Sequence, residues 1–161
     1  MLFRSVRISS KFDRKRFHPI LHVERAHLGI DYAAPVGTPV WASASGRVLE
    51  AGMKRGSGNT IVIAHSNGLN TRYYHLSKFA RGLHAGMQVR QKDVIGFVGT
   101  TGLSTGPHLH FSVTKNGAFV DPAKLAVNRD PPVADPGQFR DAIRPRIAAL
   151  KAMQTPAVAK N

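Results

Sequence analysis

The sequence has no cysteine, one tryptophan, few acidic residues and no long apolar segment. Because cysteine is absent, disulfide bonds and thiolate metal sites are excluded, and a bound metal ion would need histidine and carboxylate ligands. The absence also suits an oxidising compartment. No apolar run approaches the roughly 18 residues that span a bilayer. The apolar part of residues 1–7 is too short for a secretory signal, so either the chain is cytosolic or an export signal lies outside it.

The charge is strongly one-sided. Lysine and arginine number 23 against 9 acidic residues, which gives a formal net charge of +14 over 161 residues. A protein with such a charge is drawn to polyanions. The basic residues are densest in residues 4–25, but neither a recognition helix nor a row of stacking aromatic residues accompanies them. We therefore expect no specific nucleic-acid partner, and we regard an anionic cell-envelope surface as the candidate partner of the basic residues.

Short β-strands dominate the predicted secondary structure. Strand-like runs joined by glycine- and proline-containing turns indicate a mainly antiparallel sheet, and Asn67-Gly68 and Asn116-Gly117 are strong hairpin signals. The expected strands span residues 5–10, 38–42, 47–51, 60–65, 71–76, 94–98 and 108–114. We expect one β domain over residues 1–127, a linker at 128–134, a C-terminal helix over 135–154 and a frayed tail at 155–161.

Two short motifs carry the chemistry, His27-Leu-Gly-Ile-Asp31 and Gly106-Pro-His108-Leu-His110-Phe. Either motif alone is weak, because a chain with 8 histidines contains such spacings by chance. In a strand, alternation places the imidazoles of His108 and His110 on one face, and a metal ion or a catalytic task is a good reason to keep them together. Gly29 disfavours a helix through the first motif, but a curved loop or an irregular strand would still let both ends reach one ion.

Two histidines and one carboxylate, with water in the remaining position, form an open catalytic zinc site. Three of the four motif residues suffice as ligands. The fourth would then lie beside the metal ion without binding it, which is where a general base or an oxyanion donor is needed. The motifs alone do not tell which histidine takes that place.

Together with the glycine pattern between them, the motifs make the sequence similar to the LytM/lysostaphin-type zinc metallopeptidases of peptidoglycan, and most similar to the Gram-negative branch of MepM and ShyA. The matching residues are Ile8–Phe12, Arg16–Pro19, His27, Asp31, Ala34–Pro35, Gly37–Val40, Gly46, Val48, Gly58–Asn59, Tyr74–Leu76, Gly96, Val98–Gly99, Thr101–Gly102 and Gly106–Phe111. The resemblance covers about residues 5–125. It implies a LytM-type antiparallel β-sheet catalytic domain, of the duplicated hybrid motif kind, with a short C-terminal helix.

The resemblance also implies a role for each motif residue. His27, Asp31 and His110 match the ligands of one Zn²⁺ ion per chain, and His75 and His108 match two catalytic histidines that do not bind the ion. The metal ion would polarise the scissile carbonyl and lower the pKa of its bound water. One of the two catalytic histidines would take the proton of that water, and the other would stabilise the oxyanion.

Asn59, Thr101 and Thr105 are the candidate substrate-binding residues. Asn59 matches a family position, although its side-chain amide also suits holding a turn. Thr101 and Thr105 belong to the polar loop before the second motif, which would line the cleft. His65 and His84 are expected to be structural or exposed.

We therefore expect a monomeric zinc endopeptidase that acts in the periplasm, at the cell envelope or outside the cell, in cell-wall remodelling or lysis. Its expected substrate is the peptide stem of peptidoglycan, cut at the cross-link between D-alanine and diaminopimelate, with a glycine-rich bridge as the alternative. A non-enzymatic family member that regulates amidases would lack motif residues, and all five are present here. A basic nucleic-acid-binding β protein would explain the charge but not these five residues.

Overall fold

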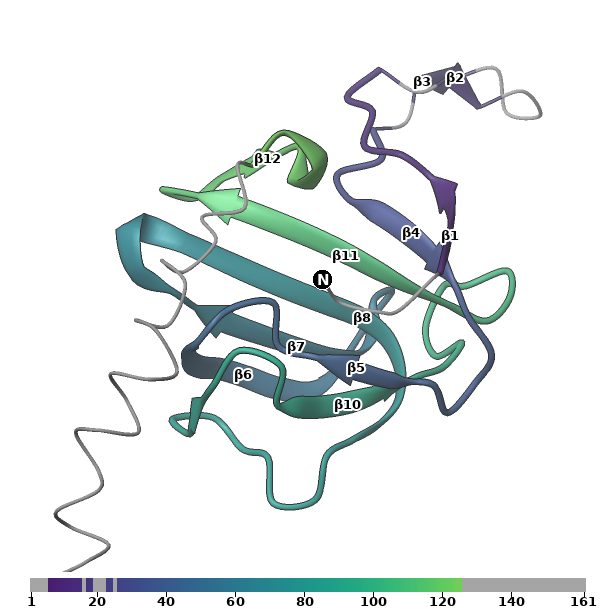
Figure 1. Cartoon of the computed structure of the whole chain (residues 1–161). Helices are drawn as coiled ribbons and strands as arrows, with labels where there is room; N and C mark the ends of the chain where they lie inside the picture. Colours follow the sequence, from purple (N-terminus) through teal and green to yellow (C-terminus); the bar gives the residue numbers. More distant parts are fainter. Residues whose placement is uncertain (1–5, 16, 19–22, 25, 126–161) are drawn as a thin grey trace, which may run out of the picture. The chain divides into compact units, whose positions relative to one another are not determined.

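The computed structural model describes residues 6–15, 17–18, 23–24 and 26–125, in which antiparallel β-strands dominate (Figure 1). The mainly β fold predicted from the sequence is therefore confirmed. The predicted linker at 128–134, helix over 135–154 and tail at 155–161 lie outside the described residues. Within the described part, the structure contains no helix that is long and apolar enough to cross a membrane.

Ten strands belong to one sheet, and two more form a separate hairpin. The strands of the sheet are β1 (Arg7–Ser10), β4 (Ile30–Ala33), β5 (Pro39–Trp41), β6 (Gly46–Lys54), β7 (Gly58–Ala64), β8 (Leu69–Phe79), β9 (Gln88–Val89), β10 (Val94–Val98), β11 (His108–Lys115) and β12 (Ala118–Val120). The hairpin pairs β2 (Phe17–His18) with β3 (Val23–Glu24). Two single turns of 3₁₀ helix, η1 (Ser66–Gly68) and η2 (Pro122–Lys124), complete the described elements.

The strand order brings distant parts of the sequence together. The main path through the sheet is β1-β4-β11-β8-β7-β6-β9, while β10 pairs with β5 and β8, and β12 pairs with β11. Figure 1 shows β4, β11 and β8 side by side. Because β11 lies between β4 and β8, His110 has Asp31 as its neighbour on one side and Tyr74 on the other. Asp31 of the first motif therefore lies in the strand next to His108 and His110 of the second.

Each strand expected from the sequence has a counterpart whose ends differ by a few residues. The sequence does not predict β2, β3, β4, β9 or β12, each of which has four residues or fewer. Strands of this length are too short to show the alternation that marks a strand, and β4, β9 and β12 form because a longer neighbour offers its edge. β4 matters most among them, since it carries Asp31.

The core face of β11 explains where the histidines point. Leu109, Phe111 and Val113 are buried, with exposed fractions of 0%, 6% and 3%, and they belong to the same core cluster as the fully buried Tyr73 and Leu76 of β8. Burial of these alternate residues fixes the register of β11, because a slip by one residue would move them out of the apolar core and onto the polar face of the strand. His108 and His110, which alternate with these apolar residues, therefore lie on the opposite face, as the alternation predicts.

Both Asn-Gly pairs occupy turns. Asn116 and Gly117 join β11 to β12 with φ angles of 49° and 84°, the left-handed pair that a two-residue hairpin turn of type I′ requires. Asn67 and Gly68 join β7 to β8 with φ angles of 59° and 68°. These two predicted turns are confirmed.

Candidate metal centre

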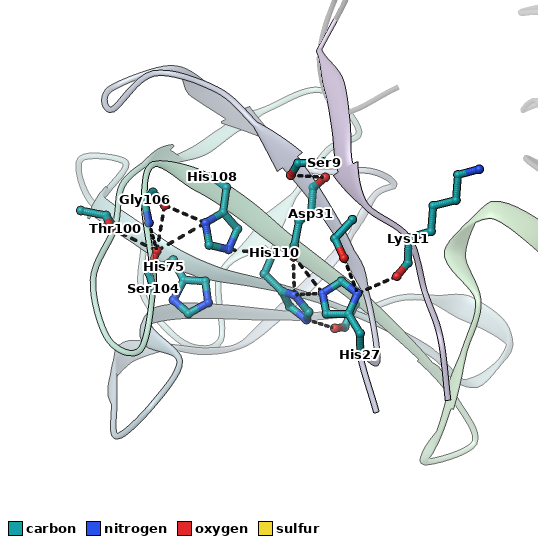
Figure 2. A network of polar contacts seen from close by, with 12 residues as sticks. Ser9, Lys11, His27, Asp31, His75, Thr100, Ser104, Gly106, His108 and His110 are labelled. Atoms are coloured by element: carbon teal, nitrogen blue, oxygen red, sulfur yellow. Dashed lines mark hydrogen bonds and ion pairs between the residues drawn. The ribbon is translucent and has the colours of Figure 1, made fainter. Parts of the chain in front are cut away.

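The two motifs meet on one face of the sheet. Asp31 of β4 stands opposite His110 of β11, and the backbone of His27 pairs with that of Asp13 just before β4. His110 Nδ1 lies 2.7 Å from Asp31 Oδ1. His27 Nε2 lies 3.0 Å from Asp31 Oδ2 and 3.2 Å from His110 Nδ1. Figure 2 shows these three side chains pointing toward one another.

A second layer of contacts orients the two imidazoles. His27 Nδ1 donates to the main-chain carbonyl of Lys11 at 2.7 Å, and His110 Nε2 lies 2.9 Å from the hydroxyl of Ser112. A carbonyl only accepts, so Nδ1 carries the proton of the neutral His27 ring. Its Nε2 then faces the carboxylate of Asp31 as a lone pair, which is the arrangement found in metal sites whose outer contacts fix the histidine tautomer.

The ligand atoms have the spacing of a metal site. One ligand atom from each of His27, Asp31 and His110 lies within 4.8 Å of the others. The ligands of a tetrahedral zinc ion, each about 2.1 Å from it, stand roughly 3.4 Å apart, and the atoms described above are 2.7–3.2 Å apart. The side chains are between 13% and 17% exposed. The residues present therefore fit a metal ion that is reached from solvent at one open position.

Electrostatics favour the same assignment. Burial alone would raise the pKa of Asp31, but hydrogen bonds and charge interactions with His110 and His27 in their protonated forms outweigh it and hold the pKa of this carboxyl well below its usual range. The carboxylate is therefore ionised at neutral pH, as a metal ligand must be.

Close packing explains why a glycine stands in the middle of the first motif. A Cβ atom at Gly29 would lie 2.6 Å from His110 Nε2, from the Phe111 carbonyl and from the Ser112 hydroxyl. Only glycine lets the backbone pass this close to β11, and this passage sets His27 beside the metal face of the sheet.

His108 and His75 lie beside the ligand cluster. His108 Nε2 is 3.9 Å from Asp31 Oδ1, and the ring centres of His108 and His75 are 4.9 Å apart. The ring centres of His75 and His110 are 6.3 Å apart. The structure thus brings together all five residues that the sequence singles out, with two imidazoles next to the three clustered ligand atoms (Figure 2).

Main-chain carbonyls orient this second pair as well. His108 Nδ1 donates to the carbonyl of Gly106 at 2.8 Å, and His75 Nδ1 donates to that of Thr101 at 2.7 Å. Each neutral ring therefore has its lone pair on Nε2. Burial lowers the pKa of His75; the bond to Thr101 opposes this shift, and the charge of His108 adds to it.

His75 occupies a β-bulge in β8. Leu76 pairs with Asn59 and Tyr73 pairs with Ile61, so β8 contains one residue more than β7 between the two pairs. The backbone of His75 has φ 60°, in the left-handed region, which costs a residue other than glycine about 1–2 kcal/mol. Bulges of this kind re-aim a side chain next to an active site.

Asn59 and Thr101 hold the bulge in place. The Thr101 hydroxyl donates to the Leu76 carbonyl at 2.8 Å and accepts from the main-chain N–H of Asn59 at 2.9 Å. The Asn59 side chain donates to the carbonyls of Leu76 and Ser77 at 3.0 and 3.2 Å. Two residues expected to bind substrate therefore make hydrogen bonds within the protein, whereas the third, Thr105, is exposed in the loop before β11.

Two other histidines, His65 and His84, lie away from the centre. His65 lies 2.8 Å from the carbonyl of Ser45 and 2.7 Å from the hydroxyl of Thr71. His84 is exposed and bonds within its own turn. Both environments agree with the structural or exposed roles expected from the sequence.

Two neighbours of the centre, Tyr74 and Ser112, are given no role by the sequence analysis. Tyr74 stacks on the ring of His110, with ring centres 5.3 Å apart and an angle of 27° between the planes, and Ser112 contacts the same imidazole from the other end. Alternation is the signal that would find them, because Ser112 follows His110 by two residues and Tyr74 pairs with it in register.

Comparison with known proteins agrees with this geometry. The sequence profile of peptidase family M23 matches residues 25–122, which include all five residues of the centre. The DD-carboxypeptidase/endopeptidase Mpg of Neisseria meningitidis serogroup B is 54% identical over 121 residues, 75% of this chain and 27% of Mpg. The peptidoglycan DD-endopeptidase ShyC of Vibrio cholerae serotype O1 is 43% identical over 116 residues, 72% of this chain and 26% of ShyC. The chain spans about a quarter of the length of these relatives.

The fold is also that of a solved structure, a zinc containing peptidase from Vibrio cholerae. It matches with a TM-score of 0.71 and 36% identity, over 74% of this chain and 37% of that chain. The resemblance inferred from the sequence, including its ShyA-like branch, is thereby confirmed. Since the profile match covers more than half of the 161 residues, the chain belongs to peptidase family M23.

Proposed function

We propose that this chain is a zinc-dependent endopeptidase that hydrolyses peptide cross-links of peptidoglycan. The observation that carries the proposal is the convergence of three ligand atoms, from His27, Asp31 and His110, next to two imidazoles whose Nε2 atoms are available. The names of the relatives Mpg and ShyC support a DD-peptidase. We therefore propose the D-alanine to diaminopimelate bond as the target and the extracytoplasmic side of the membrane as the place of action.

Zinc is the proposed metal because the ligand set is two histidines and one carboxylate, which is a frequent catalytic zinc set. The similar peptidase from Vibrio cholerae is a zinc containing protein, which supports the same choice. Bound at this centre, the ion would supply a Lewis acid for the scissile carbonyl and for water activation.

The protein's own groups would provide the proton transfers. In the neutral state, the Nε2 atoms of His75 and His108 each accept a proton, because their Nδ1 atoms are committed to carbonyl oxygens. One of them would take up the proton of the attacking water, and the other, once protonated, would donate to the oxyanion or to the leaving amine. The exposed Thr105 would line the cleft, and Asn59 and Thr101 would act by keeping His75 in position.

A defined substrate tests the proposal. The purified chain should contain one zinc ion, and it should convert a diaminopimelate-linked muropeptide dimer into two monomers with the mass of one water added. A glycine-bridged dimer serves as the comparison and should stay intact. His75→Ala and His108→Ala should keep the zinc and lose about 10²–10⁴-fold in hydrolysis rate. Intact diaminopimelate dimers after incubation with the zinc-loaded chain would refute the function.

A further inference from the structure

A basic and aromatic cluster adjoins the metal centre on the same face of the sheet. Tyr74 stacks on His110, and Arg72 lies two residues before Tyr74 in β8, on the same face of the strand. Arg72 pairs with Ser112 in register, and Tyr74 pairs with His110. Two residues along a strand span about 7 Å, so Arg72 originates roughly one residue pair away from the proposed ligand.

The charge of Arg72 is not balanced within the described part of the chain. None of the described carboxylates forms an ion pair with Arg72, and its Nε atom is buried without a hydrogen-bond partner among the described residues. The carboxylate of Glu50 is bound to Lys54 at 2.7 Å. This carboxylate therefore does not neutralise Arg72.

A partly buried cation with an unused donor favours an anionic ligand, because an unpaired charge or donor is costly to bury. The ring of Phe119 lies beneath the guanidinium, 5.9 Å from ring centre to Cζ. The ring forms an apolar support for one face of the planar guanidinium. A guanidinium together with a phenol hydroxyl is a donor set for a carboxylate, which accepts from several N–H and O–H groups at once.

The proposed substrate has a carboxylate in a matching place. A DD bond joins the carbonyl of one D-centre to the nitrogen on a second D-centre. The carbon of that second centre, which is bonded to the scissile nitrogen, also has a free α-carboxylate. This holds for the D-centre of diaminopimelate in a cross-link and for a terminal D-alanine. A glycine-rich bridge has no free carboxylate there, because the next peptide bond uses it.

We propose that Arg72 and Tyr74 form a carboxylate-binding subsite beside the metal centre, which holds the free α-carboxylate of the residue that follows the scissile bond. This inference rests on the proposed peptidase function and names the feature that selects its substrate. One subsite of this kind would admit both a cross-link and a peptide end, and it would disfavour a bridge without the carboxylate.

The test measures binding of two ligands to two protein variants. The probes are a stem peptide ending in D-alanyl-D-alanine and the same peptide with a C-terminal amide. Their dissociation constants are measured on the zinc-loaded His108→Ala protein, which should not turn them over, with and without Arg72→Gln. We expect the His108→Ala protein to bind the carboxylate form about 10–100-fold more tightly than the amide, and Arg72→Gln to remove most of this preference.

Two further variants separate recognition from folding. Arg72→Lys should retain part of the preference, because it keeps the charge but loses the planar fork. Lys78→Gln changes a cation of the same strand that packs on Phe97 instead, and it should leave the preference unchanged. Equal preference with and without Arg72→Gln, or no preference before that change, would overturn the subsite. A preserved carboxylate preference in a wild-type protein that leaves the diaminopimelate-linked dimer intact would refute the proposed function alone.

Discussion

Replacing His75 by glycine should give a more stable protein than replacing it by alanine. Both substitutions remove the same imidazole, the same hydrogen bond to the Thr101 carbonyl and nearly the same buried surface. They differ in how they meet the backbone, which has φ 60° at this position. The comparison between the two variants therefore isolates the strain of the bulge.

The magnitude follows from two opposing terms. Alanine at a left-handed position pays about 1–2 kcal/mol that glycine does not, whereas glycine loses about 0.4–1 kcal/mol through the greater freedom of its unfolded chain. The first term is the larger, so His75→Gly should exceed His75→Ala in free energy of unfolding by about 0.5–1 kcal/mol. In a chain of this size that corresponds to roughly 1–4 °C in Tm.

Urea unfolding of the metal-free variants, followed by circular dichroism, measures the difference. The matched control is Lys78, an exposed position in the same strand that does not have a positive φ. There the order should reverse, with alanine more stable than glycine by about 0.5–1 kcal/mol. Both His75 variants should be inactive. If His75→Ala proves as stable as His75→Gly, the bulge stores no strain and the reasoning fails.

Other substitutions test the metal centre, its support and the charge. His110→Ala should lose the zinc while the circular dichroism spectrum stays that of a β protein; full zinc content would remove His110 from the ligand set. Ser112→Ala should weaken zinc binding about 10–100-fold in competition with a chelator, and an unchanged affinity would contradict the orienting role of the hydroxyl. Thr101→Val should keep the zinc, lower the free energy of unfolding by about 1–2 kcal/mol and reduce turnover, whereas wild-type turnover would show that the bulge needs no such clamp. Raising salt should reduce lysis of whole sacculi but not cleavage of a small muropeptide, since exposed charges act over only about 8 Å at physiological ionic strength. Neutralising Arg7 and Arg14 should make the lysis of sacculi less dependent on salt concentration. Identical salt dependence for both substrates would show that the basic residues have no targeting role.

Much of this centre is visible in the sequence because it depends on local alternation. The apolar residues Leu109 and Phe111 fix one face of β11, and the pairing of His108 with His110 on the other face follows directly. The position of His75 does not follow in this way. Its bulge adds one residue to β8, so alternation cannot predict the direction of the side chain beyond that point.

The roles of Asn59 and Thr101 depend on contacts that a local pattern does not contain. Thr101 is 25 residues from the carbonyl of Leu76 that it binds, and 42 residues from Asn59. Only the folded backbone reveals that Thr101 and the side chain of Asn59 donate to carbonyls of β8. Hydrogen bonds between residues so far apart in the sequence depend on how the whole sheet folds, and the loop residues alone do not determine them.

The carbonyls that orient the histidines belong to the main chain of Lys11, Thr101 and Gly106. Every amino acid has such a carbonyl, so the identity of residue 11 is free to drift without loss of the proton placement on His27. Inserting or deleting one residue near position 11 would instead move the carbonyl away from the ring. Along this segment, evolution should therefore tolerate exchange of side chains far better than any change in chain length.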